Sequence, residues 1–266
     1  MCGSMFSWIV GPTYKPTQTP LQKLIASAFG NGEQGVMYVP KPVVLGNQAL
    51  YQDAVGTTPV TADGDPVGLM LDVSGNGNHA TQTTSASRPI YRTDGTLHWL
   101  ECDGVDDWLD TPLATSVDTV SLRASGFSVT PTSGSIGQIH ADRANVVYGR
   151  YATGIGIDPV SVQFMRANGP DPTVVQTGIP LGSPVALQTN EEYLTGGLGD
   201  ARINGSNYQY SVERSIWSEN MSLFSGRGLT AFFSGKFFGG FIVLNRDTPP
   251  SSDVEDYLAK LAGITL

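Results

Sequence analysis

Apolar and polar residues alternate in short runs along most of the chain, and each run ends near Gly, Pro, Asn or Asp. VMYVPKPVVL, LHWLECDG and KFFGGFIVLN are three of eleven such runs, which are rich in β-branched and aromatic residues. A period of two is typical of half-buried strands, and short strands separated by turn residues favour a sandwich over a parallel α/β sheet. The pattern therefore predicts an all-β fold, a two-sheet antiparallel jelly-roll sandwich over residues 36–247.

The same alternation predicts which side chains fill the core. Eight apolar residues of the expected strands should be mostly buried: Leu69, Leu71, Trp99, Leu100, Phe164, Phe232, Phe238 and Ile242. Cys102 fits the same alternation and should behave as a small buried hydrophobic residue. A parallel sheet, or two separate cores, would contradict this prediction.

Two helices are expected outside the strand region. In TPLQKLIASAFGNG, Thr19 is a favoured N-cap, Pro20 suits the first turn and Gly30 suits the end. The apolar face of this helix holds Leu21, Leu24, Ile25 and Ala28. In SSDVEDYLAKLAGI, Ser252 can cap a short C-terminal helix that packs on the edge of the sandwich. The apolar face of that helix holds Val254, Tyr257, Leu258 and Leu261.

The first eighteen residues cannot form a core of their own, because prolines and polar residues separate a few large apolar side chains. We therefore expect residues 1–30 to be an N-terminal arm and docking helix, and residues 31–266 to be the jelly-roll domain. The docking contacts would come from Phe6, Trp8, Ile9, Leu21, Leu24 and Ile25. The partner is a copy of this chain in a homo-oligomer or another protein. The alternative is that the arm folds back over its own sandwich.

Composition excludes several classes of function. The charged fraction is 15% and the formal net charge is −9, with no basic stripe, so we exclude nucleic-acid binding as a main activity. We expect neither membrane insertion nor a signal peptide, because MCGSMFSWIV lacks a basic start and a cleavage site. Cys2 and Cys102 stand far apart, and His79, His98 and His140 show no metal-ligand spacing.

The stretch DVSGNGNH has two interpretations. Asp72, Ser74, Asn76 and Asn78 alternate like the first four ligand positions of an EF-hand calcium loop. The twelfth position is Thr83 instead of the glutamate that such a loop needs. A tight turn between strands is the favoured interpretation, and a weak calcium site is the alternative. We expect no other cofactor, and no ion with six or more oxygen ligands at about 2.3 to 2.6 Å in this stretch.

Glu101, Asp103 and Asp106 form the pattern closest to the carboxylate pair of a glycosidase. A period of two places Glu101 and Asp103 on one face of a strand, but the glycine that follows favours a turn before Asp106. Glu191 and Glu192 stand alone in the sequence, and no recognisable context for a serine or cysteine nucleophile occurs. From these observations we expect no catalytic residues and no enzymatic activity.

Several stretches resemble a known family of domains. DVSGNGNHATQ, RPIYR, LECDGVDDWLD and SGKFFGGFIVLNR, with a closing helix, resemble the concanavalin A-like, laminin-G-like jelly rolls of bacteriophage virion proteins. GNGEQGVMYVP and QDAVGTTPVTADGDPVGLMLD resemble the stretch that precedes this domain in phage tail and head-attached proteins. The resemblance covers residues 31–266 and implies the fold. Cys102 stands where family members usually carry an aromatic residue, which implies altered core packing.

The resemblance implies a structural virion protein of the tail or head, made in the host cytoplasm. In this interpretation residues 1–30 dock on other virion proteins, and the lectin-like sandwich projects for attachment to host-surface glycan. The alternative is a dedicated carbohydrate-binding adhesin, in which Trp108 and Trp217 lie in loops and stack on sugars. Burial of both tryptophans under neighbouring strands is the competing interpretation, and glycan hydrolysis is the least favoured function.

Deletion of residues 1–18 tests the docking hypothesis. If Phe6, Trp8 and Ile9 are buried against a partner, each stabilises that contact by about 1.5 to 3 kcal/mol. The shortened protein should therefore keep its melting temperature and lose its incorporation into particles. Normal incorporation, or a domain that unfolds without the arm, would contradict the hypothesis.

Overall fold

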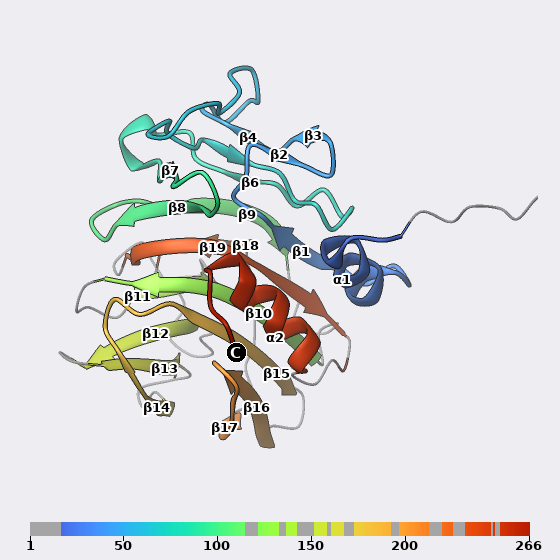
Figure 1. Cartoon of the computed structure of the whole chain (residues 1–266), viewed down its shortest axis with the longest axis vertical. Coiled ribbons are helices and arrows are strands. Elements are labelled where there is room, and N and C mark those ends of the chain that lie inside the picture. The colour runs from blue at the N-terminus through green and yellow to red at the C-terminus, as the bar shows by residue number, and fades with distance from the viewer. Residues whose placement is uncertain are drawn as a thin grey trace, which may run out of the picture.

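The computed structural model describes residues 17–114, 122–132, 137–142, 152–158, 161–167, 173–192, 197–212, 220–225, 232–245, 247 and 251–266. These residues form two packed antiparallel sheets with two α-helices, α1 (Pro20–Phe29) and α2 (Ser252–Leu261) (Figure 1). The prediction of an all-β antiparallel sandwich is confirmed. No helix among the described residues combines the length and apolar character needed to cross a bilayer.

The first sheet has eight strands in the order β17-β16-β15-β10-β19-β8-β7, and β1 also pairs with β19. Its strands are β1 (Gly35–Tyr38), β7 (Ile90–Thr93), β8 (His98–Asp103), β10 (Leu122–Pro131), β15 (Val185–Glu192), β16 (Gly197–Ile203), β17 (Ser206–Val212) and β19 (Ser234–Leu244). Gly35 of β1 lies opposite Val243 of β19, and Leu100 of β8 lies opposite Phe237 of β19. The strand β19 therefore joins the early and late parts of the chain.

The second sheet has nine strands in the order β14-β13-β12-β11-β18-β9-β6-β5-β4. They are β4 (Leu50–Tyr51), β5 (Leu69–Met70), β6 (Ala80–Thr81), β9 (Leu109–Ala114), β11 (Gly137–Asp142), β12 (Ala152–Asp158), β13 (Ser161–Ala167), β14 (Thr173–Pro180) and β18 (Asn220–Leu223). A separate pair, β2 (Val43–Val44) and β3 (Asn47–Gln48), and a 3-10 helix (Ser85–Ser87) complete the described elements.

The main core lies between the two sheets. Of the eight residues predicted to be buried, four are buried: Leu69, Leu100, Phe238 and Ile242. Leu71, Trp99 and Phe232 are half-buried. The side chain of Phe164 lies outside the described residues. Cys102 is buried in this core, as its place in the alternating pattern predicted.

A second apolar cluster lies on the outer face of the first sheet, under the two helices. Thr19 caps α1 as predicted, because its hydroxyl accepts the Gln22 N–H at 3.2 Å while the Gln22 side chain accepts the Thr19 N–H at 2.9 Å. The predicted apolar face of α1 packs into this cluster within the same chain: Leu21, Leu24, Ile25 and Ala28. Phe6, Trp8 and Ile9 lie outside the described residues. The docking role and the boundary at residue 30 therefore stay predictions.

Helix α2 lies across β10 and β15 (Figure 1). Its N-cap is Ser251, one residue before the predicted Ser252, and the Ser251 hydroxyl accepts the Val254 N–H at 3.4 Å. Leu258 is fully buried beneath the helix. Glu255 is also buried, because its carboxylate accepts hydrogen bonds from the Arg202 guanidinium and from the Gly205 N–H at 2.6 Å.

Glu255→Ala tests how strongly α2 is attached. The substitution leaves Arg202 and the Gly205 N–H without their buried acceptor, so we expect the free energy of unfolding to fall by about 3 kcal/mol. Urea unfolding measures this loss. Asp256→Ala, at the neighbouring exposed position, is the control and should change stability by about 0.5 kcal/mol or less. Equal effects of the two substitutions would contradict the prediction.

Candidate functional site

The candidate site lies on the outer face of the first sheet, beside the area that the helices cover. Neighbouring residues of a strand point to opposite faces, and Tyr91, Leu100 and Phe237 point into the core. The side chains next to them on β7, β8 and β19 therefore point outward. We call this set the outer patch: Arg92, Trp99, Glu101, Lys236 and Phe238.

Two aromatic rings form the centre of the outer patch. The ring centroids of Trp99 and Phe238 lie 5.9 Å apart, and the Lys236 ammonium lies 4.5 Å from the centroid of the Trp99 ring. This cation–π contact holds Lys236 along the surface. The Trp99 indole N–H is buried and has no hydrogen-bond partner among the residues that the structure describes. Phe238 is buried beside it, so the accessible aromatic surface of the patch comes from the half-buried Trp99 ring.

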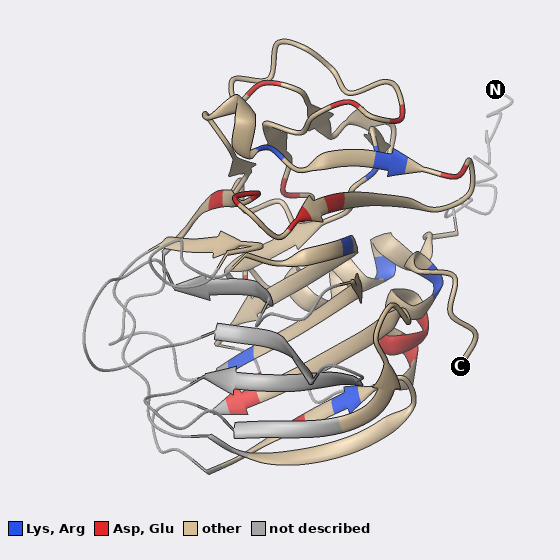
Figure 2. Ribbon diagram, turned by 90° about the vertical axis from the view of Figure 1, so that its left-hand side faces the viewer, with Lys and Arg blue, Asp and Glu red and all other residues tan. Residues whose placement is uncertain are grey.

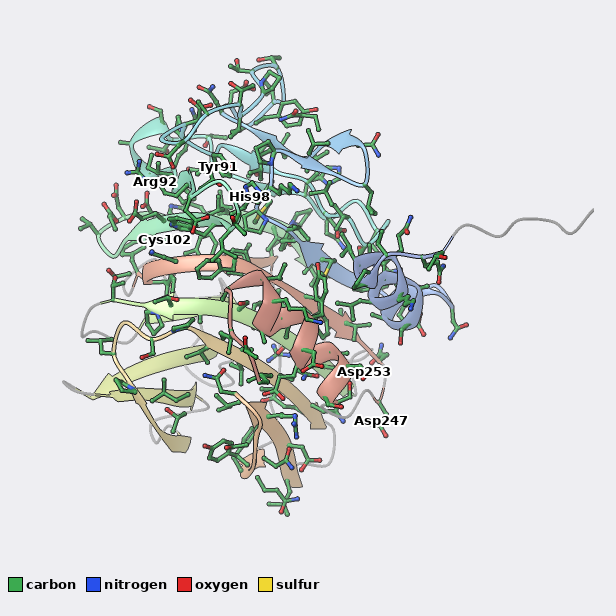
Figure 3. The ribbon with its side chains drawn as sticks, in the orientation of Figure 1. Tyr91, Arg92, His98, Cys102, Asp247 and Asp253 are labelled. Atoms are coloured by element: carbon green, nitrogen blue, oxygen red, sulfur yellow. The ribbon has the colours of Figure 1, made fainter. Side chains whose placement is uncertain are left out.

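Charged groups flank the rings in fixed positions. Arg92 Nε donates to Glu101 Oε2 at 2.6 Å, and Arg92 Nη1 lies 3.5 Å from Asp63 Oδ2. The bond to Glu101 is the main reason that the pKa of Arg92 is raised above its usual value. The Arg92 and Glu101 side chains remain 38% and 45% exposed, so both can still contact a ligand. Figure 3 shows Arg92 with Tyr91 and His98 at the β7–β8 hairpin.

A cavity of about 210 Å³ adjoins the outer patch and shares Phe238 with it. It lies where the residues after β1, the β7–β8 turn and the end of α2 meet. Its lining residues are Val39, Pro40, Lys41, Thr96, Leu97, His98, Phe238, Lys260 and Leu261. This volume is below the roughly 300 to 1,000 Å³ of sites for drug-sized ligands, so the cavity suits only a small chemical group.

His98 is a half-buried titratable group that lines this cavity. Its Nδ1 lies 2.7 Å from the Tyr91 hydroxyl, and the two rings stack with centroids 6.0 Å apart. Partial burial lowers the pKa of His98, the charge of Lys41 lowers it further, and Asp94 opposes both effects. His98 is therefore a neutral hydrogen-bonding group near pH 7.

The four residues of the predicted turn or calcium site lie together in a hydrogen-bonded loop. Asp72 Oδ1 accepts the Met37 and Ser74 N–H groups, each at 2.9 Å, and Asp72 Oδ2 accepts the Ser74 hydroxyl at 2.8 Å. The Asn76 and Asn78 side chains donate to the Gly35 carbonyl at 3.3 and 2.9 Å. The loop thereby holds the start of β1 in place. The weak calcium site remains an untested alternative.

Three carboxylates at the end of β8 and in the turn that follows lie close together. Glu101 is not one of them, because it forms the ion pair with Arg92. One oxygen from each of Asp103, Asp106 and Asp107 lies within 4.8 Å of the others. Backbone and hydroxyl groups bind all three: Asp103 accepts the Val105 N–H at 2.7 Å, Asp106 accepts the Ser87 hydroxyl at 2.9 Å, and Asp107 accepts the Asp103 N–H at 2.9 Å. Sequence reasoning missed Asp107.

The remaining predicted residues lie elsewhere. Trp108 is half-buried beside this turn, where its backbone N–H donates to the Ser87 carbonyl at 3.3 Å. Trp217 lies outside the described residues, so the glycan-binding prediction for both stays untested. The sequence suggested that Glu191 stands alone, but in the structure it has partners. It is buried, and its carboxylate binds Arg123 Nη2 at 3.1 Å and the Tyr210 hydroxyl at 2.5 Å.

Comparison with known proteins shows the fold. No protein-family model matches the chain, and no curated protein matches it. Solved structures do match. An arabinofuranosidase complexed with arabinofuranosyl-α-1,2-xylobiose has a TM-score of 0.55 at 14% identity, over 89% of this chain and 64% of that chain. A Trypanosoma rangeli sialidase complexed with 2,3-difluoro-KDN has a TM-score of 0.51 at 13% identity, over 90% of this chain and 39% of that chain.

A third match comes from a study of botulinum neurotoxin type C, whose cell entry depends on two ganglioside molecules. Its TM-score is 0.51 at 10% identity, over 89% of this chain and 53% of that chain. This chain therefore spans about two thirds or less of each of these three proteins. The matches show a β-sandwich fold that parts of two glycoside hydrolases and of a neurotoxin share. None of them points to a bacteriophage.

These matches correct the expectation of no enzymatic activity. That expectation depended on the spacing of Glu101, Asp103 and Asp106, which tests only one local arrangement of carboxylates. Parts of the arabinofuranosidase and of the sialidase, both glycoside hydrolases, share the fold of this chain. The spacing of three carboxylates was therefore too narrow a basis for that expectation.

The pH dependence of stability tests the environment of Asp107. Burial raises the pKa of Asp107 from 3.8 to about 6, and the neighbouring Asp103 and Asp106 add to the effect. The folded state therefore binds this proton more tightly than the unfolded state, and its contribution to stability is lost as the pH rises from about 4 to above 6. As the pH rises over this range, the free energy of unfolding of the native protein should fall by about 1 to 2 kcal/mol relative to that of Asp107→Asn.

Urea unfolding at several pH values between 4 and 7 measures this difference. Asp256→Asn, at an exposed position, is the control and should show no such trend. A constant difference between the native protein and Asp107→Asn would contradict the assignment.

Proposed function

We propose that this protein binds carbohydrate through the outer patch. The observation that carries the proposal is the half-buried Trp99 ring, which packs on the buried Phe238 and is flanked by the charged groups of Arg92, Glu101 and Lys236. Sugars present apolar C–H faces that stack on aromatic rings and hydroxyl groups that bond to fixed donors and acceptors. The outer patch offers both kinds of contact on one surface.

The position of the patch favours binding as well. Its residues come from three hydrogen-bonded strands instead of a loop, and Arg92 is held by Glu101 and Asp63. Groups that are already ordered lose little conformational entropy when a ligand arrives. The likeness in fold to proteins solved or studied with saccharides supports the proposal at the level of the scaffold.

A more specific role follows only from the sequence resemblance described above. In that role the protein is a virion component that uses the outer patch to attach a bacteriophage particle to host-surface glycan, and residues 1–30 dock on the particle. Deletion of residues 1–18 tests this role separately from carbohydrate binding. Carbohydrate binding itself does not depend on where the protein acts.

Substitutions in the outer patch test carbohydrate binding. The native protein should bind some members of a glycan array, and Trp99→Ala should weaken the best of these contacts about tenfold, because it removes the stacking surface. Trp99→Phe keeps a ring and should lose less affinity. Lys236→Gln should also weaken binding, whereas the matched control Lys23→Gln, on α1, should not.

Circular dichroism confirms that each variant is folded, and the release of reducing ends from the bound glycans measures hydrolysis in the same samples. Native protein that binds no glycan would overturn the proposal. Unchanged affinity in a folded Trp99→Ala variant would show that the outer patch is not the binding site.

A further inference from the structure

We propose that the cavity beside the outer patch receives an anionic sugar residue, such as a terminal uronic acid, whose negative group is held by Lys41 and Lys260. The inference depends on the carbohydrate binding proposed above and adds the chemical class of the sugar. Both lysines line the cavity, and no acidic side chain is among its described lining residues.

The charge of the cavity differs from that of the whole chain. The formal net charge is −9, and only five lysines are present, yet two of them border this one cavity. Neither Lys41 nor Lys260 has an ion-pair partner within 4.0 Å among the described residues. Figure 2 shows basic and acidic residues interspersed over the described part of the chain. A local excess of positive charge attracts anions and discriminates against neutral ligands.

Three nearby features oppose an anion. Asp256 stands one turn before Lys260 on α2, and both residues line a neighbouring cavity. Asp94, in the β7–β8 turn, carries a negative charge close to His98, although its carboxylate is held by the Thr96 and Leu97 N–H groups at 2.9 and 2.8 Å. The C-terminal end of α2 also carries a partial negative charge of about half a unit. The backbone N–H groups of Ala262, Gly263 and Ile264 donate to the last carbonyls of α2. These hydrogen bonds reduce the partial charge that the end of the helix exposes. Of these charged groups only the two lysines line the cavity itself, so their charges act on a bound ligand at the shortest range.

The rest of the cavity suits a sugar better than a bare anion. Its apolar walls come from Val39, Pro40, Leu97, Phe238 and Leu261. An inorganic anion would make no use of these walls, whereas the C–H face of a sugar ring can pack on them. Because Phe238 belongs to both the cavity and the outer patch, a glycan that lies on Trp99 can place its terminal residue in the cavity.

Polar groups are available for the hydroxyls of that sugar. Thr96 and His98 line the cavity. The Tyr91 hydroxyl bonds to His98 Nδ1, and when Tyr91 donates, the neutral imidazole carries its proton on Nε2. His98 then offers this N–H to the ligand. The two lysines, Thr96 and His98 come from three separate segments, which together define one small binding site.

Matched oligosaccharides test the inference with the full-length protein. One probe ends in glucuronic acid and the other in glucose, and calorimetry in low salt gives the ratio of their affinities. The acidic probe should bind at least tenfold more tightly, and this ratio should fall as salt is added. The double variant Lys41→Gln/Lys260→Gln should bring the ratio close to one. The control Lys23→Gln, which removes a lysine of α1, should leave the ratio unchanged.

The outcomes separate the two proposals. Failure to bind either probe or any array glycan counts against carbohydrate binding itself. Equal binding of both probes by the native protein, or a ratio that survives in the double variant, overturns the anionic-sugar inference alone. Inorganic sulfate that competes as well as the acidic sugar would show a free-anion site and would also overturn it.

NMR titration of His98 gives a second readout. A bound anion should raise the pKa of His98, which Lys41, Lys260, Asp94 and Tyr91 surround, and a neutral sugar should not. The same shift with both probes would contradict the inference.

Discussion

The eight-stranded sheet must keep water from both of its faces around β19, and the arrangement of the helices follows from that requirement. On β19, Ile242 and Leu244 point into the core between the sheets, whereas Phe241 and Val243 point to the other side. The apolar faces of α1 and α2 cover this second side. Their cover does not extend to Arg92 and Glu101 of the outer patch, whose side chains stay exposed. The same requirement thus explains both the position of the helices and the position of the candidate site.

Close packing around β19 depends on two glycines. A Cβ atom on Gly240 would lie 2.3 Å from Phe127 Cδ1, and one on Gly239, at a φ of +139°, would lie 3.0 Å from Leu261 Cδ1 and from the Tyr38 carbonyl oxygen. Glycine at position 239 lets β1 and the end of α2 approach β19 this closely, and glycine at position 240 makes room for Phe127 of β10. The residues that follow β1 and the end of α2 carry walls of the cavity beside the outer patch, so its shape depends on the backbone as well as on the lining side chains.

The sequence predicted features that depend on local chemistry. The Thr19 cap and the alternation of the strands both act over a few residues, and both predictions are confirmed. The site was harder to predict, because a period of two does not say which face of a sheet is the core. Trp99 was therefore assigned to the interior, whereas it lies half-buried on the outer patch. The cavity was not predicted at all, since residues 39–41, 96–98 and 260–261 meet only after folding.

Buried charges show the same limit. Glu255 binds Arg202, and Glu191 binds Arg123, across long separations that sequence spacing does not reveal. Local spacing also misled the search for carboxylates: Glu101 pairs with Arg92 on the neighbouring strand instead of acting with Asp103. A pattern of acids within one segment is a poor test for activity in a sandwich, whose surfaces combine strands from distant parts of the chain.

The central place of β19 also affects how the protein is made. It follows every other strand in the sequence, yet β1, β8 and β10 all pair with it. Until β19 leaves the ribosome, those strands lack their common neighbour, and their backbone edges and apolar faces stay exposed. Pairing over such distances makes folding slow and leaves the nascent chain prone to aggregation. Synthesis of this protein therefore has a long vulnerable interval that ends only when its last strand is available.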